Sequence, residues 1–153
     1  MSSAPALAQI VALFESLAED ERRENLVAYA EKAAGHEPRA GEIFELEDVR
    51  KDEECTDTVG IFLKLNPRGR VTLRVRLGPE VQTLTKAMTA ILCKGLAGLT
   101  LEEIIELPSD FVPKIIGEKL VRIRSQTVFY VLTRIKGACK VLRTRGRAGK
   151  SAD

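Results

Sequence analysis

The sequence predicts an α+β fold, in which a small antiparallel sheet of two or three strands packs against several helices. The first observation is a β-hairpin, because an apolar run over residues 59–65 and an alternating run over 71–77 flank a turn at 66–69. The second is that apolar residues recur at helical spacing on both sides of this hairpin. Helices that are segregated from a short antiparallel hairpin are typical of the α+β class.

Two short amphipathic helices are expected before the hairpin. A charged break over residues 19–24 separates them, and Gly35 follows the second. Residues 36–51 are rich in Gly, Pro and Glu, so they predict a long connection that packs loosely over the domain, with His36 in a turn. The apolar residues of the two helices are Leu7, Ile10, Val11, Phe14 and Leu17, then Leu26, Val27, Ala30 and Ala33.

Three helical segments are expected after the hairpin. Gly78 and Pro79 open the first, which Gly98 closes. Thr100 and Glu103 form a capping box for a short helix that runs through Leu107. Pro108 breaks the chain, Phe111, Ile115 and Ile116 provide apolar anchors, and a long helix follows. The buried stripes of the first and last helices are Val81, Leu84, Met88, Ile91, Leu92 and Leu96, then Val128, Val131, Leu132, Ile135, Cys139 and Leu142.

The length of 153 residues predicts one domain over residues 1–142 and a basic, flexible C-terminal tail over 143–153. No apolar run approaches the roughly 18 residues of a spanning helix, and no basic and then apolar leader begins the chain, so a cytoplasmic protein without a membrane partner is expected. The tail is either a solvated terminus or an anion-binding segment, and nucleic acid is not an expected partner because no aromatic residues interleave with its charges. The cations in question are Lys136, Lys140, Arg143, Arg145, Arg147 and Lys150.

Three cysteines and one histidine, without CxxC or HxxxH spacing, predict neither a disulfide framework nor a metal site. Cys93 and Cys139 fall in or near helical apolar stripes, where a free cysteine behaves as a small hydrophobe. Cys55 instead stands between an acidic run, 52–54, and the hairpin, which makes it the candidate nucleophile. The other interpretation is a semi-buried loop cysteine.

Carboxylates beside Cys55 raise the pKa of its thiol, so the local sequence does not favour a free thiolate at neutral pH. These carboxylates belong to Glu53, Glu54 and Asp57. Either a cation comes from elsewhere in the fold, or Cys55 acts as a modest thiolate that receives sulfur from the persulfide of a docked partner.

Several local strings, in this order, resemble the SufE family of sulfur acceptors in iron–sulfur cluster assembly. Residues 10–14 (IVALF) and 20–32 (DERRENLVAYAEK) resemble its first two helices, and Cys55 followed by Val59 resembles its cysteine loop. The remaining matches are Lys86 in LTKAM, Gly98 with Thr100 and Glu102 to Ile104, and Arg124 with Ser125 and Gln126.

The resemblance implies a function of the sulfurtransferase type, and whether the chain counts as an enzyme stays open. A pyridoxal-phosphate cysteine desulfurase would form a persulfide, Cys55 would take its outer sulfur and stimulate the desulfurase, and an iron–sulfur scaffold would receive the sulfur. This chain has no phosphate-cradling glycine motif, so the cofactor is expected on the partner and none on the chain itself.

The resemblance also implies roles for neighbouring residues. Arg124, near the start of the last helix, either stabilises a thiolate or persulfide anion at Cys55 or is a surface arginine. Lys86 either helps in the same way or lies along a helix surface. The residues expected to contact the desulfurase are Glu53, Glu54, Thr56, Asp57 and Lys86.

Two further hypotheses come from other function classes. The family usually has Gly before the cysteine and Gln and Ser after it, whereas this chain has Glu54, Thr56 and Asp57, with Gly60 at a position that is usually aromatic or His. These departures favour, as the alternative, a regulator that binds the desulfurase without transferring sulfur. The last hypothesis is an anion or nucleic-acid binder that uses the basic tail.

Overall fold

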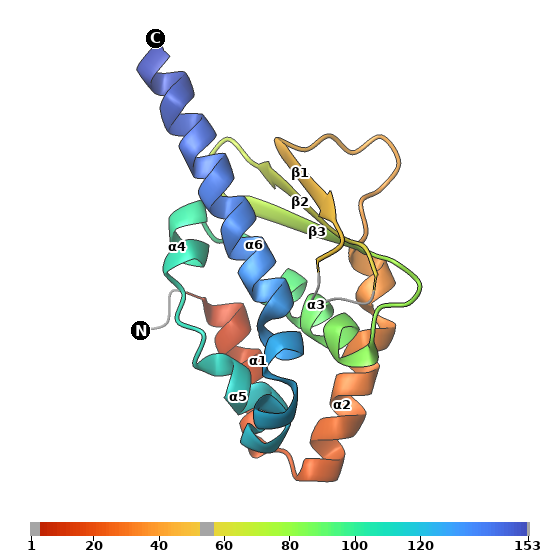
Figure 1. Ribbon diagram of the computed structural model, residues 1–153. Coiled ribbons are helices and arrows are strands. Elements are labelled where there is room, and N and C mark those ends of the chain that lie inside the picture. The colour runs from red at the N-terminus through yellow and green to blue at the C-terminus, as the bar shows by residue number, and fades with distance from the viewer. Residues whose placement is uncertain (1–3, 53–56, 153) are drawn as a thin grey trace.

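The computed structural model describes residues 4–52 and 57–152, with side chains described through residue 146. It confirms the α+β class, with helices on one side of an antiparallel sheet of order β1-β2-β3 (Figure 1). Within these ranges no helix is long and apolar enough to cross a membrane. The elements are α1 (Pro5–Ser16), α2 (Glu19–Glu31), η1 (Ala33–His36), β1 (Leu46–Arg50), β2 (Val59–Leu65), β3 (Val71–Leu77), α3 (Thr83–Leu96), α4 (Leu101–Glu106), α5 (Phe111–Ile116) and α6 (Glu118–Ala152).

The predicted hairpin is confirmed as β2 and β3, which pair from Val59↔Leu77 to Leu65↔Val71. Its turn is closed by Asn66, whose Oδ1 accepts hydrogen bonds from the backbone N–H groups of Arg68 and Arg70, each at 2.9 Å. Alternate residues of both strands face the helices and are buried, as a period of two requires.

The third strand, β1, pairs antiparallel with β2, from Leu46↔Leu63 to Arg50↔Val59. Residues 36–51 are therefore not only a loose connection, because their last part forms an edge strand. Residues 51–58 connect β1 to β2. They join the sheet at the end of the strands where Arg50, Val59 and Leu77 lie side by side. Cys55 belongs to this connection by sequence.

The rest of that predicted connection is also tied down. Glu42, whose side chain is 7% exposed, pairs with Lys64 of β2 at 2.6 Å and with Arg74 of β3 at 3.3 Å. Phe44 packs on Phe62 with ring centroids 5.3 Å apart. Residues 37–45 thus cover the sheet face opposite the helices, which explains why Phe62 is buried although its neighbours in β2 face the other way.

The helices form a second layer on the inner face of the sheet. Figure 1 shows α6 running across the sheet, with its C-terminal end projecting beyond the other elements. α3 packs against β3, α1, α2 and α6, so it is the central helix of this layer. Its buried side chains, among them Met88, Ile91 and Leu92, join the core with the inner-face residues of β2 and β3.

The N-terminal helices differ from prediction in two places. The charged segment 19–24 is the start of α2 rather than a break. Acidic residues are favourable in the first turn of a helix, and the Glu21 side chain accepts a hydrogen bond from the Ala18 N–H at 3.2 Å. Val27, which was expected to be buried, is 44% exposed.

The later helices follow the sequence signals with shifted boundaries. The Thr100 capping box is confirmed, because Thr100 Oγ1 accepts from Glu103 N and Glu103 Oε1 accepts from Thr100 N. α3 begins at Thr83, not at Gly78 and Pro79, which belong to the connection that precedes it. α6 continues to Ala152, past Leu142, where the domain was predicted to end and the tail to begin. The flexibility of residues 143–153 stays a prediction.

Candidate functional site

Four of the predicted site residues, Glu53, Glu54, Cys55 and Thr56, lie outside the described residues. The structure does describe the residues on either side of them in the chain, Lys51 and Asp52 before and Asp57 and Thr58 after. We call residues 51–52 the Asp52 flank and residues 57–58 the Asp57 flank. The contacts of these two flanks with the rest of the fold define the candidate site.

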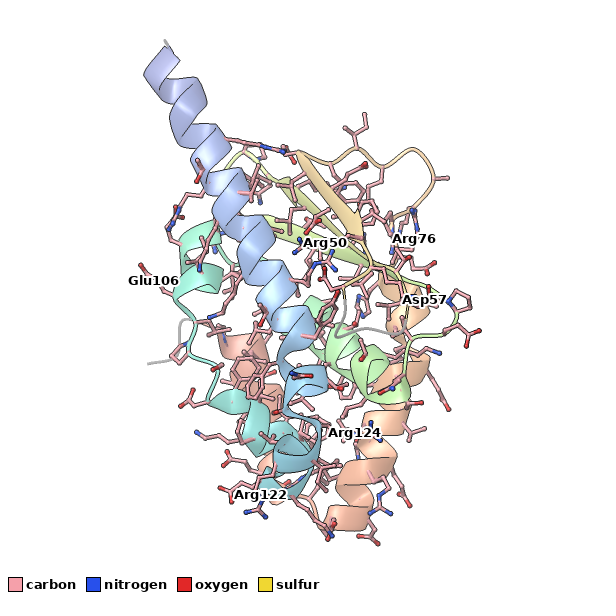
Figure 2. All side chains as sticks on the ribbon, in the orientation of Figure 1. Arg50, Asp57, Arg76, Glu106, Arg122 and Arg124 are labelled. Carbon is pink, nitrogen blue, oxygen red and sulfur yellow. The ribbon has the colours of Figure 1, made fainter. Side chains whose placement is uncertain are left out.

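The Asp57 flank is fixed to the connection between β3 and α3 (Figure 2). Asp57 Oδ1 accepts from Thr58 N at 2.7 Å and Oδ2 from Glu80 N at 2.8 Å, and Gly78 N donates to Thr58 O at 2.9 Å. The hydrogen bond from Glu80 N, and then that from Thr58 N, lower the pKa of Asp57.

Gly78 makes room for the Asp57 carboxylate. A Cβ atom at Gly78 would lie 2.2–2.4 Å from the carboxylate atoms of Asp57, closer than any non-bonded contact allows. Glycine at this position is therefore a requirement of the Asp57 flank, as expected where another group approaches the backbone closely. Contact of Asp57 with a partner stays a prediction.

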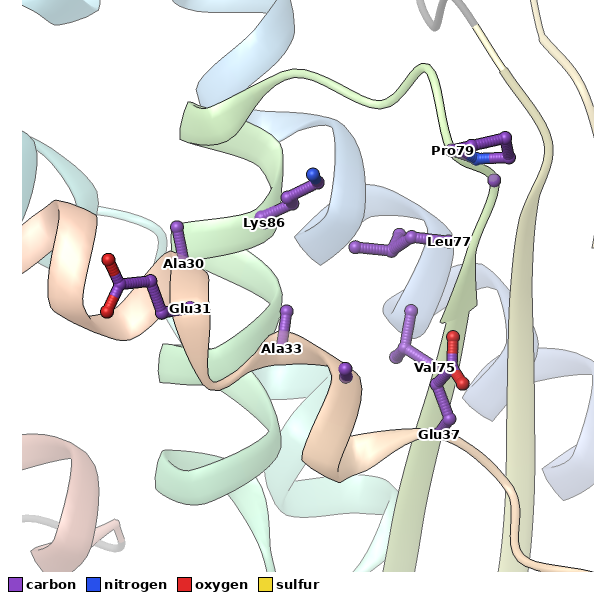
Figure 3. Close-up of a pocket in the computed structure, with 10 residues that line it drawn as sticks. Ala30, Glu31, Ala33, Glu37, Val75, Leu77, Pro79 and Lys86 are labelled. Carbon is purple, nitrogen blue, oxygen red and sulfur yellow. The ribbon is translucent and has the colours of Figure 1, made fainter.

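A cavity of about 320 Å³ lies beside this flank, between α2 with η1 on one side and β3 with α3 on the other. Figure 3 shows Lys86 reaching from α3 toward Leu77 across it. Small and apolar side chains, including Ala30, Ala33 and Val75, form much of its wall, and Gly78 with Pro79 forms the end next to Asp57. The described lining therefore combines apolar side chains with one cation, Lys86, and two carboxylates, those of Glu31 and Glu37.

Lys86 is half-buried, and no hydrogen bond or ion pair joins its side chain to another described residue. Its position in the cavity fits either of its two predicted roles. Arg124 is exposed, at a non-helical residue of α6 with φ −126° and ψ 35°. Figure 2 shows it in the half of the molecule away from the sheet, and no interaction joins it to either flank within the described ranges. Its role stays a prediction.

Sequence reasoning missed a cluster that holds the Asp52 flank. Tyr130 Oη donates to Asp52 Oδ2 at 2.9 Å and accepts from Arg134 Nη1 at 2.7 Å. Burial, and then the hydrogen bond to Asp52, raise the pKa of Tyr130 to about 12, so the hydroxyl remains protonated and able to donate. The available signal was Arg134 itself, a charged residue within the apolar stripe of the last helix, between Val131 and Ile135.

The other two cysteines have the predicted character. Cys93 and Cys139 are free thiols at most 4% exposed, and burial raises the pKa of each to about 12. Both are therefore small core residues and poor nucleophiles. No group of three or more His, Cys, Asp or Glu side chains in residues 4–52 and 57–152 could hold a metal ion.

Comparison with known proteins gives one family and two similar folds. The model of the family described as SufE, Fe–S metabolism associated domain, matches residues 8–139. A hypothetical protein from Thermus thermophilus, solved in solution, is 25% identical over 92% of this chain and 98% of its own, with a TM-score of 0.72. The N-terminal part of a nitrogen-fixing NifU-like protein from Brucella abortus is 13% identical over 78% of this chain and 92% of its own, with a TM-score of 0.55. No curated protein matches the chain.

Proposed function

Because this chain belongs to the SufE family of iron–sulfur metabolism proteins, we propose that it accepts sulfur from a cysteine desulfurase on Cys55 and passes it on for iron–sulfur cluster assembly. We expect the release of sulfur from cysteine to take place on the partner, since this chain has no phosphate-cradling glycine motif in its sequence. The pyridoxal phosphate belongs to the desulfurase, and the chain acts on the persulfide that the desulfurase makes.

The transfer is an exchange between sulfur atoms. The Cys55 thiolate attacks the outer sulfur of the partner's persulfide, a new S–S bond forms at Cys55, and the S–S bond of the partner breaks. The partner's cysteine leaves as a thiolate and takes up a proton equivalent to the one that Cys55 lost. No external oxidant or reductant is needed, because the outer sulfur keeps its oxidation state.

The observation that supports this proposal best is the cavity beside the Asp57 flank. It is bounded by Gly78, against which Asp57 packs two residues after Cys55 in the chain. Its apolar side chains would shield part of a persulfide from water and small reductants. The Lys86 ammonium would favour the persulfide anion over the neutral form, whereas the Glu31 and Glu37 carboxylates at the same cavity would oppose this effect. Arg124 is the second cation proposed for the role of Lys86.

The test compares how the protein and its variants stimulate a cysteine desulfurase, measured as alanine released from cysteine. If Cys55 is the acceptor, the wild-type chain accelerates turnover and Cys55→Ser does not. Cys93→Ala serves as the matched control, because Cys93 is buried in α3 and should leave the stimulation unchanged. Equal stimulation by wild type and Cys55→Ser refutes sulfur acceptance as the cause.

A second function is favoured by Glu54, Thr56 and Asp57, which replace the residues usual around the family's cysteine. In this alternative, the chain binds the desulfurase as a regulator and carries no sulfur. It predicts full stimulation by Cys55→Ser, together with the same affinity for the desulfurase as wild type, measured by calorimetry.

A further inference from the structure

The guanidinium of Arg134 joins the two strands from which the Cys55 connection departs. Its Nη2 donates to the carbonyl of Asp48 in β1 at 2.8 Å and to that of Val59, the first residue of β2, at 2.9 Å. The side chain is 3% exposed, so α6 delivers this cation into the interior next to the last pair of the β1–β2 ladder. One side chain thus fixes both strands at the place where they separate.

Tyr130 extends this link to the Asp52 flank. Residues four apart lie on the same helix face, which places its hydroxyl beside Arg134, where it accepts from Nη1 at 2.7 Å. The same hydroxyl donates to Asp52 Oδ2 at 2.9 Å, and Asp52 is the last described residue before segment 53–56. The chain of contacts therefore runs from Val59 through Arg134 and Tyr130 to Asp52, joining both sides of the connection.

Stability alone does not account for this arrangement. Burying a guanidinium carries a desolvation cost that its ion pairs seldom exceed, and apolar residues of similar volume usually stabilise a core as well or better. The pairs of Arg134 with Asp48 and Asp52 are 3.4 and 3.7 Å long, and its Nε has no hydrogen-bond partner among the described residues. What the cluster supplies is a defined geometry for the ends of the connection.

We propose that Tyr130 and Arg134 are positioning residues for sulfur transfer, which hold the Asp52 flank and Val59 so that Cys55 is presented to the partner's persulfide in a reactive orientation. This inference rests on the proposed function. Asp57 holds the other flank through Glu80 N. Loss of the Tyr130 hydrogen bond therefore loosens one end, which keeps only the longer ion pairs of Asp52 with Arg134 and Arg50, at 3.7 and 3.6 Å, while the other end stays tied.

The test is the rate at which sulfur appears on Cys55, followed by mass spectrometry of the Cys55 peptide as the concentration of persulfide-loaded desulfurase is varied. Tyr130→Phe removes one oxygen atom and both of its hydrogen bonds. A displacement of about 1 Å at a reacting group costs up to about 100-fold, so the rate at saturating partner should fall roughly 10- to 100-fold. The half-saturating concentration should stay unchanged, because no partner contact is removed.

Two further variants separate positioning from folding. Tyr29→Phe is the matched control, because Tyr29 packs on Phe14 and its hydroxyl has no hydrogen bond to any described residue. It should transfer sulfur at the wild-type rate. Arg134→Met replaces the buried cation by an apolar side chain of similar length. It should lower the stability, because Asp48 and Asp52 lose this partner, but it should keep cooperative unfolding, since these carboxylates are 30% and 27% exposed and can be solvated, while the saturating rate is lost.

The outcomes distinguish this inference from the function on which it rests. If wild type acquires no sulfur on Cys55, the proposed function itself is wrong. If wild type acquires sulfur and both Tyr130→Phe and a folded Arg134→Met do so at the same saturating rate, the positioning role alone is refuted. A change confined to the half-saturating concentration also refutes it, because that result places Tyr130 in the docking surface.

Discussion

Replacing Gly78 by alanine should impair sulfur transfer without unfolding the protein. The added Cβ would lie 2.2–2.4 Å from the Asp57 carboxylate, whereas ordinary van der Waals contact begins near 3.4 Å. The carboxylate must therefore move by about 1 Å or more, which breaks its hydrogen bonds from Thr58 N and Glu80 N. The backbone of Gly78 needs no positive φ, so the clash is the only obstacle to alanine.

The size of the effect follows from that displacement. A shift of about 1 Å in a reacting group can cost up to 100-fold in rate, so the transfer rate to Cys55 should fall by roughly 10- to 100-fold. Asp57→Ala removes the same anchor from the other side and should give a loss of similar size. Because both changes release one anchor, the double variant should be no slower than either single variant.

The assay is the single-turnover rate of sulfur transfer, with thermal unfolding of each variant as a check on folding. Gly137→Ala is the matched control, since Gly137 lies within α6, a Cβ added there would meet no atom within 4 Å, and alanine favours a helix. A folded Gly78→Ala protein with the wild-type rate would refute the role of the Asp57 flank. If the rate losses of Gly78→Ala and Asp57→Ala multiplied in the double variant, the two changes would not act through the same anchor.

Three other predictions concern the fold around the site. The backbone hydrogen bond from Arg39, together with the Lys64 and Arg74 side chains, lowers the pKa of Glu42 from 4.5 to about 2. The ionised Glu42 side chain therefore stabilises the folded protein fully above about pH 4.5, and this contribution disappears as the pH falls toward 2. The difference in Tm between wild type and Glu42→Gln should shrink over that range, and a constant difference would contradict this prediction. Cys93 and Cys139 should react with a thiol reagent only in denaturant, and labelling of either thiol in the folded protein would show that the core opens. Ile61→Ala should lower the free energy of unfolding by about 2–5 kcal/mol, whereas Ile43→Ala, at an 85% exposed position, should change it by less than about 0.5 kcal/mol in a urea titration.

Sequence patterns were sufficient for the elements in which one physical signal dominates. The hairpin has a period of two and an Asn-Pro-Arg-Gly turn, and the Thr100 capping box requires only residues that are close together in the chain. β1 was missed because it is a short edge strand whose Val49 faces away from the helices and is 52% exposed. Its stability comes from pairing with β2 and from long-range contacts, which local periodicity does not record.

In the candidate site, too, residues marked by local sequence could be predicted and residues that act through long-range contacts could not. Cys55 could be singled out by its neighbours in the sequence and by the family resemblance. Arg134 is visible in the sequence only as a charge within an apolar stripe. Its partners and the role of Tyr130 could not be predicted, because their contacts join α6 to residues far earlier in the chain, at Asp48, Asp52 and Val59. The same applies to Asp57, whose acceptor role depends on the missing side chain at Gly78 and not on any feature of the cysteine segment.

The basic end of α6 was interpreted either as a solvated terminus or as an anion-binding segment, and one of its cations, Lys136, has a structural contact. Lys136 Nζ donates to the carbonyls of Ile105 and Leu107, at the C-terminal end of α4, and burial lowers the pKa of Lys136. Lys140 and Arg145 are exposed on the projecting part of α6. Binding of an anion by that part of the helix stays a prediction.

The most direct test of sulfur acceptance by Cys55 is peptide-level mass spectrometry after the protein is mixed with a cysteine desulfurase and cysteine, under conditions that preserve persulfides. Wild type and Cys55→Ser are compared in parallel. If Cys55 is the sulfur acceptor, one added sulfur atom appears on the Cys55 peptide of wild type and none on the corresponding peptide of the variant. An unmodified Cys55 in the presence of an active desulfurase would contradict this role.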